Sequence, residues 1–336
     1  MIPESLKSIP SSSISELLYE NHSDLMAEFY EMQSKFLTSR YQVHKNIETS
    51  NISIFLARNL HLSIVRQREK KLDFDVSLEN FFENASKVNK NPQKIVSIVN
   101  TTGIPKETVR RKLKKLVEKD FVDMDKKNKE YFWNLKYRRK TEFLNMMNSD
   151  IKSISKFILI ISRYLNLNLN QKFIEDEIKS QFSFYFYHFY NCQLDWLKMW
   201  QTKIKDVDLI FIVIQALIPT LKYAAKSGYV GPDNFHTLVG KTNNKYRTSN
   251  ETISASSISE VSGIPRATCI RKLEKLVQLG MLVREIKSKR YFINQTMSDR
   301  TKHITKKENI LYTIQIFSDF LSTVISAVTR DKKNKL

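Results

Sequence analysis

One stretch of this chain occurs twice. Residues 103–134 (GIPKETVRRKLKKLVEKDFVDMDKKNKEYFWN) align without a gap to residues 263–294 (GIPRATCIRKLEKLVQLGMLVREIKSKRYFIN), and fifteen of the 32 positions are identical. The offset is 160 residues, and at the same offset residues 29–37 share Phe, Tyr, Gln and Leu with residues 189–197. The chain therefore contains an internal duplication, and any fold or function must account for both copies.

Each copy predicts a tight turn, a helix and a hairpin. Gly103 suits the turn because a residue without Cβ tolerates positive φ, and Pro105 presets φ for a helix start. The segments FVDMD and EYFWN are strand-like, and KKNK between them forms a basic hairpin tip. Apolar residues recur at helical spacing in the first copy, which predicts one buried stripe: Val109, Leu113, Leu116 and Val117.

The GIPxxTxxRKLxKLV run and its hairpin resemble the winged helix-turn-helix of bacterial transcription regulators, especially the MarR-like group. The resemblance implies that the helix after the glycine turn is a recognition helix in a DNA major groove, and that the hairpin, or wing, touches the DNA backbone. MarR-like regulators build a dimer interface from the helices that flank this motif. We therefore expect a mainly α fold with small β-wings, in which two winged-helix domains of one chain are flanked by helices that pack into a pseudo-dimeric helical body. The alternative is two winged helices strung along a helical scaffold without symmetry.

The repeat and the composition predict the domain boundaries. We expect a flexible N-terminal arm over residues 1–15, a first repeat over 16–175 with its winged helix at about 90–135, a second repeat over 176–328 with its winged helix at about 251–295, and a basic tail over 329–336. Residues 229–252 are rich in Gly, Asn and Ser and predict a loop, and Pro219 predicts a kink or break in a helix over 207–227. The aromatic run 182–190 predicts a helix buried in the interface between the repeats, or else the wall of a pocket for a small-molecule effector.

Composition favours a nucleic-acid partner. The chain has 55 Lys and Arg against 35 Asp and Glu, a formal net charge of +20, and such an excess attracts polyanions. Two cysteines exclude a disulfide framework, and no signal pattern or apolar run of membrane-spanning length is visible, so we expect a cytoplasmic protein without a membrane partner. The sequence shows no catalytic or metal-binding pattern, so we expect no enzyme activity and no cofactor.

Cationic residues of the two helices and wings are the candidate DNA-binding groups. Arginine can bind guanine in a bidentate manner, whereas wing lysines contact phosphates and give affinity without sequence information. The two helices differ, because Glu107, Arg110 and Lys114 are replaced by Ala, Ile and Glu in the second copy, so we expect unequal half-sites or a weaker second head. The candidates are Lys106, Thr108, Arg110, Arg111, Lys114, Lys126, Lys127 and Lys129 in the first copy, and Arg266, Thr268, Arg271, Lys272, Lys275, Lys287, Lys289 and Arg290 in the second.

These features predict a sequence-specific, double-stranded DNA-binding transcription regulator that places two heads of one chain on two half-sites. One alternative is a replication initiator of the plasmid or phage kind, since some of these carry tandem winged helices. The other is a chromosome-organising adaptor whose winged helices bind protein, against which the cationic helices argue.

Overall fold

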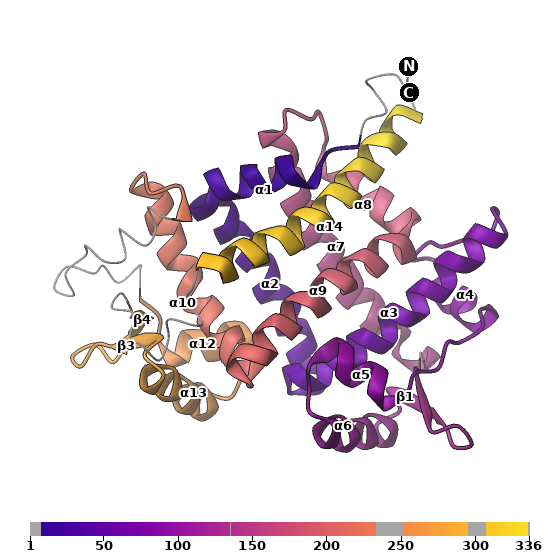
Figure 1. Ribbon diagram of the computed structural model, residues 1–336, viewed down its shortest axis with the longest axis horizontal. Coiled ribbons are helices and arrows are strands. Elements are labelled where there is room, and N and C mark those ends of the chain that lie inside the picture. The colour runs from indigo at the N-terminus through magenta and orange to yellow at the C-terminus, as the bar shows by residue number, and fades with distance from the viewer. Residues whose placement is uncertain (1–7, 135, 233–251, 295–306, 335–336) are drawn as a thin grey trace. The chain divides into compact units, whose positions relative to one another are not determined.

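The computed structural model describes residues 8–134, 136–232, 252–294 and 307–334. These residues are mainly helical, with two small antiparallel hairpins, as the sequence predicts (Figure 1). Cα proximity divides the chain into two compact units. Unit 1 consists of residues 1–9, 48–202 and 319–336, and unit 2 consists of residues 10–47 and 203–318.

The helices of unit 1 are α3 (Ile47–Lys70), α4 (Phe81–Lys87), α5 (Ile95–Thr102), α6 (Lys106–Glu118), α7 (Lys140–Tyr164), α8 (Gln171–Ser180) and α9 (Phe182–Ile204), and its strands are β1 (Val122–Asp125) and β2 (Glu130–Trp133). Unit 2 holds α1 (Ser11–Glu20), α2 (His22–His44), α10 (Val207–Lys226), α12 (Ala255–Ser262), α13 (Arg266–Gln278), β3 (Leu282–Arg284) and β4 (Tyr291–Ile293). The long helix α14 (Lys307–Asn334) contributes its first part to unit 2 and the rest to unit 1.

The duplicated stretch forms the same structure twice, which we call the first and second helix–hairpin motifs (residues 95–134 and 255–294). In each, a short helix, a turn and a longer helix precede a two-stranded antiparallel hairpin. The hairpins pair Val122 with Trp133 and Leu282 with Ile293. Three of the four residues of the predicted apolar stripe are buried, because Val109, Leu113 and Leu116 are at most 1% exposed, whereas Val117 is only half-buried.

The turn between the paired helices depends on glycine at the predicted position. Gly103 has φ of 70° and Gly263 has φ of 71°, in the left-handed region where a Cβ is unfavourable. Each turn is closed in the same way. The hydroxyl of Thr102 or Ser262 donates to a carbonyl one turn back and accepts the backbone N–H of the residue after the glycine. Both copies therefore fix the entry of the second helix with the same local chemistry.

The structure extends the duplication to helices outside the motifs. Helices α2 and α9 begin and end at positions 160 residues apart, and so do α1 and α8. Yet the repeats are not the compact units. Unit 1 joins α3–α7 of the first repeat to α8, α9 and the last part of α14, whereas unit 2 joins α1 and α2 of the first repeat to α10, α12, α13 and the first part of α14. Each compact unit thus contains helices from both repeats.

Unit 1 has a core of aromatic rings around His61. The imidazole stacks on Phe81 at 4.9 Å between centroids and meets Phe182, Phe186 and Tyr190 within 5.9 Å. His61 is fully buried, neither of its ring nitrogens has a hydrogen-bond partner among the described residues, and burial lowers its pKa to about 3. The aromatic run of 182–190 therefore supplies core side chains, as expected of a buried helix.

Unit 2 has a core in which α10 packs along α2. The Gln215 amide donates to the Ser34 hydroxyl at 2.9 Å, Lys222 pairs with Glu31, and Tyr41 lies 6.2 Å from Phe211 between ring centroids. Helix α10 and residues 307–330 of α14 are long and apolar enough to cross a membrane by length and composition alone. More than half of the α10 segment is buried against protein, and it carries paired polar groups, as a core helix does.

Three boundary predictions change. Helix α1 begins at Ser11 and buries Ile14 and Leu18, so the expected arm of residues 1–15 is too long; the serine run starts a helix whose i, i+4 pair is buried. Helix α14 continues to Asn334 through most of the expected basic tail of 329–336. Pro219 lies inside α10 without ending it. The predicted loop of 229–252 falls largely outside the described residues.

Candidate nucleic-acid interface

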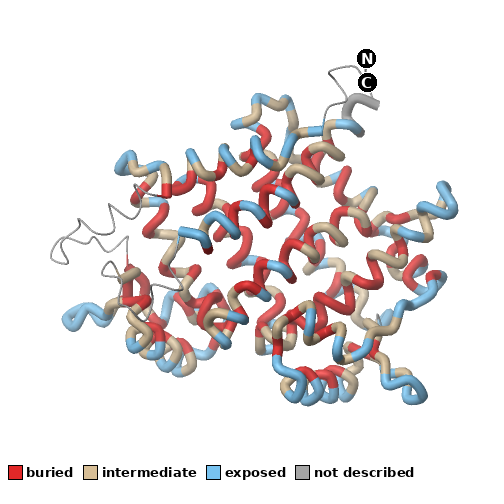
Figure 2. Tube along the Cα trace, in the orientation of Figure 1, coloured by how far each residue is buried: buried red, intermediate tan, exposed pale blue. Residues whose placement is uncertain are grey.

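The outer face of α6 presents the predicted cations. Lys106, Arg110, Arg111 and Lys114 are exposed, whereas Thr108 is half-buried. Arg110 forms an ion pair with Glu107 one turn earlier, with 2.8 Å between Nη1 and Oε2. Lys106, Arg111 and Lys114 make no ion pair with any residue that the structure describes. Figure 2 shows the exposed residues along this helix and at the hairpin tips.

Asp125 organises the first hairpin tip. Its carboxylate accepts the backbone N–H of Lys127 at 2.9 Å and the side-chain amide of Asn128 at 2.8 Å, and these hydrogen bonds lower the pKa of Asp125. Lys129 takes the left-handed conformation, with φ of 53°. Lys126, Lys127 and Lys129 are all exposed, so a structured turn presents three ammonium groups to solvent.

The second motif presents fewer cations. Arg266, Arg271 and Lys275 are exposed, and Thr268 is half-buried. Arg266 donates to the Ser256 hydroxyl at 3.1 Å, which connects α13 to α12. Helix α13 carries four basic residues against six in α6. The second motif is therefore the less cationic of the two.

Lys272 is a correction to the predicted site. Its ammonium lies 3.1 Å from Asp206 and 3.3 Å from Asp208, and the side chain is only 13% exposed. The matching residue of the first motif, Lys112, lies 3.2 Å from Glu48. In each unit this lysine connects the second helix of the motif to the start of a long helix, so it supports the fold and is not available to a ligand.

Arg290 is a second correction. Its guanidinium donates to the hydroxyl and carbonyl oxygens of Thr252 at 2.6 and 2.8 Å, which braces the second hairpin against the chain before α12. Lys287 and Lys289 remain exposed, and Lys289 repeats the left-handed turn of Lys129. At the tip, Ile286 replaces Lys126 and is 90% exposed.

The change from Lys114 to Glu274 has a structural partner. The Glu274 carboxylate lies 3.0 Å from Arg284 of β3 and accepts the Tyr291 hydroxyl of β4 at 2.7 Å. Burial, with this hydrogen bond, raises the pKa of Tyr291 to about 12. In the first copy the position of Arg284 is Met124, so the helix and the hairpin have changed together. The Glu274 carboxylate thereby connects α13 to its hairpin, and α6 has no carboxylate at this position.

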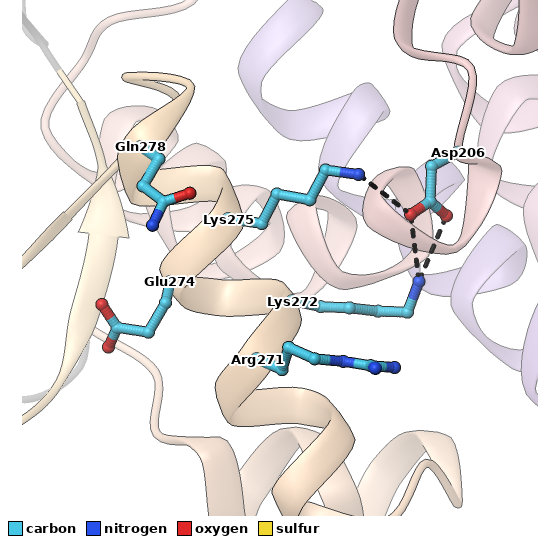
Figure 3. A pocket seen from close by; sticks show the side chains of 6 residues that line it. All are labelled: Asp206, Arg271, Lys272, Glu274, Lys275 and Gln278. Carbon is cyan, nitrogen blue, oxygen red and sulfur yellow. Dashed lines mark hydrogen bonds and ion pairs between the residues drawn. The ribbon is translucent and has the colours of Figure 1, made fainter.

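A groove of about 470 Å³ runs beside α13. It is lined by Asp206, Arg271, Lys272, Glu274, Lys275 and Gln278. Figure 3 shows the ammonium groups of Lys272 and Lys275 converging on Asp206, while Glu274 points away from it. Lys275 lies 3.6 Å from the carboxylate.

No known protein family, curated protein or solved structure matches the chain. The geometry of the two motifs is therefore the basis for assigning a function.

Sequence reasoning missed Lys112 and the carboxylates that hold the two inward lysines. The signal was present, because Lys112 is identical in both copies and lies one turn after Val109, at the edge of the buried stripe. A cation at such a position packs its stem on the core and needs a nearby carboxylate. Asp206 and Asp208 are distant in sequence from α13 and carried no local signal.

Proposed function

We propose that this protein is a sequence-specific, double-stranded DNA-binding regulator in which both helix–hairpin motifs act as winged helices. The single observation that carries the proposal is the repetition of one cationic geometry: a helix with a buried apolar stripe, exposed arginine on its outer side, and a following hairpin with exposed lysines. A helix of this kind suits the major groove, and the lysine tips suit the flanking phosphates.

Arg111 and Arg271 are the proposed base-reading residues. They occupy matching positions, both are exposed, and neither has an ion pair among the residues described. Their guanidinium groups are free of the carboxylates that hold Lys112 and Lys272. An arginine in this state can bind guanine O6 and N7 in a bidentate manner.

We also propose that the chain binds as a single-chain pseudo-dimer. The composition of the units supports this, because each compact unit combines one motif with helices from the other repeat. Sedimentation should then show a monomer, and the DNA footprint of this monomer should cover two adjacent half-sites, on the order of one DNA turn apart. A stable homodimer protecting two equivalent sites would favour the strung-out arrangement.

The experiment that tests DNA binding starts with selection and sequencing of genomic fragments bound by the full chain. Affinity for a selected duplex is then measured against salt for wild type, Arg111→Ala, Arg271→Ala and the control Arg163→Ala. Arg163 is exposed on α7, so its substitution makes the same charge change away from the motifs. We expect either motif variant to lower affinity about tenfold or more and to leave Tm unchanged, because one bidentate base contact is worth about 1–3 kcal/mol.

If Arg163→Ala costs as much affinity as the motif variants, net charge rather than the helices explains binding, and the proposal fails. Binding sites upstream of promoters would support a regulator. Iterated sites beside a replication origin would instead support an initiator, which shares the same geometry.

A further inference from the structure

Asp206 immediately precedes α10 and contacts two cations of α13. Its side chain does not cap its own helix; its oxygens lie 3.1 and 3.2 Å from the Lys272 ammonium, and one lies 3.6 Å from that of Lys275. The Asp206 side chain is 28% exposed, so it lies at the solvent edge of the groove. One carboxylate thus neutralises charge on the face of the helix proposed to meet DNA.

Only one of these two lysines has a second carboxylate. Lys272 also lies 3.3 Å from Asp208, whose other oxygen accepts the backbone N–H of Ile47 at 3.0 Å. Asp208 is the more buried carboxylate and fixes Lys272 in the fold. Lys275 is 52% exposed, and its sole ion-pair partner among the described residues is Asp206. Asp206 is therefore dispensable for holding Lys272, and its distinct effect is on Lys275.

The same groove has the groups that a phosphate needs. Arg271 and Lys275 are separated by four residues, so they lie on one side of α13, and both line the groove. Arg271 has no ion pair with a described residue. A DNA phosphate in the groove would take Lys275 as its cationic donor, next to the base contact proposed for Arg271, and would face the Asp206 carboxylate across the groove (Figure 3). Phosphate and Asp206 are like charges that compete for Lys275.

The first copy lacks this carboxylate. Position 46, which aligns with Asp206, is asparagine, and Lys115, which aligns with Lys275, is exposed without an ion pair in the described part of the chain. The residue that supports the fold, in contrast, is acidic in both copies, as Glu48 and Asp208. The second copy therefore has an additional acid at a position where the first copy has a neutral side chain.

We propose that the groove beside α13 is a binding site for one DNA-backbone phosphate, and that Asp206 weakens it by competing for Lys275. This inference rests on the proposed function, and it explains how one of two similar heads can bind DNA more weakly. Loss of the carboxylate releases Lys275 to the phosphate while Lys272 stays bound to Asp208.

The test is a double-mutant cycle on the full chain, with Asp206→Asn, Lys275→Gln and the double variant measured against salt on a selected duplex. Asp206→Asn should bind about five to ten times more tightly near 0.1 M salt, with a salt slope steeper by about 0.9, as expected for one added phosphate contact. Adding Lys275→Gln should abolish the gain. Alone, Lys275→Gln should cost less than twofold in affinity, much less than Arg271→Gln, which keeps the inference testable if Asp206→Asn fails to fold.

Several results would overturn the inference: an unchanged salt slope in Asp206→Asn, a gain that persists without Lys275, or an equal loss for Lys275→Gln and Arg271→Gln. If wild type binds DNA and Arg111→Ala weakens it while the cycle shows no coupling, only the phosphate site is wrong. If wild type binds no duplex at any salt concentration, the proposed function itself is wrong.

Discussion

Replacing His61 with leucine should make unit 1 more resistant to acid. The folded imidazole has a pKa of about 3 because burial among aromatic rings disfavours its charged form, whereas an unfolded histidine titrates near 6.5. The unfolded state therefore binds the extra proton. The contribution of neutral His61 to the free energy of unfolding is therefore fully present above pH 6.5 and is lost as the pH falls toward 3.

The size of the effect follows from the two pKa values. Each pH unit below 6.5 costs about 1.4 kcal/mol, so the free energy of unfolding should fall by about 2 kcal/mol between pH 7 and pH 5 from His61 alone. Burial also lowers the pKa of His188 in the same unit, so the difference between wild type and variant isolates His61. Leucine suits the site, since the aligned residue of the second repeat is the fully buried Leu221. It also removes two buried nitrogens that have no partner among the described residues, at a gain of roughly 1 kcal/mol or more.

The assay is urea unfolding followed by tryptophan fluorescence at several pH values. The chain has three tryptophans, Trp133, Trp196 and Trp200, and all belong to unit 1, so the signal reports that unit. His61→Leu should flatten the dependence of unfolding free energy on pH between 5 and 7. Identical pH slopes for both proteins would refute the assignment of a neutral, buried His61.

Three further substitutions test the motifs themselves. Lys112→Met should lower the stability of unit 1 by roughly 2 kcal/mol, because Glu48 is left partly buried without its cation, and the loss of Tm should exceed that of Arg111→Ala. Gly103→Ala should cost roughly 1 kcal/mol, because the turn needs positive φ; urea unfolding that matches wild type would contradict this. Ile286→Lys gives the second hairpin tip the residue found at the matching position of the first. If this lysine reaches a phosphate, the salt dependence of DNA affinity should become steeper by up to about 0.9, and if the tip lies away from DNA, the slope should not change.

Local chemistry explains what the sequence could predict. The turn at Gly103, the buried stripe through Val109 and Leu113, and the lysine hairpin tips all depend on residues close in sequence, and the structure has each of them as predicted. The periodicity of apolar residues and the chemistry of turns depend on residues within about one helix length of each other. The sequence of one chain is therefore enough to predict these features.

What the sequence could not predict depends on contacts between distant residues. The partners of Lys272 belong to the turn before α10, and Arg290 is held by Thr252. Both cations look free in the sequence, because nothing near them indicates a carboxylate or a carbonyl. The division into compact units is non-local in the same way, since residues 10–47 join residues 203–318.

That division affects how the chain can fold as it leaves the ribosome. Residues 10–47 are synthesised early, but their partners extend to residue 318, and unit 1 needs residues 319–336. Neither unit can be completed until α14 has been made, and α2 must wait for α10, along which it packs. A stop codon between the two repeats would release a fragment in which each unit lacks essential helices, and such a fragment is a substrate for chaperones and proteases rather than half of a working protein.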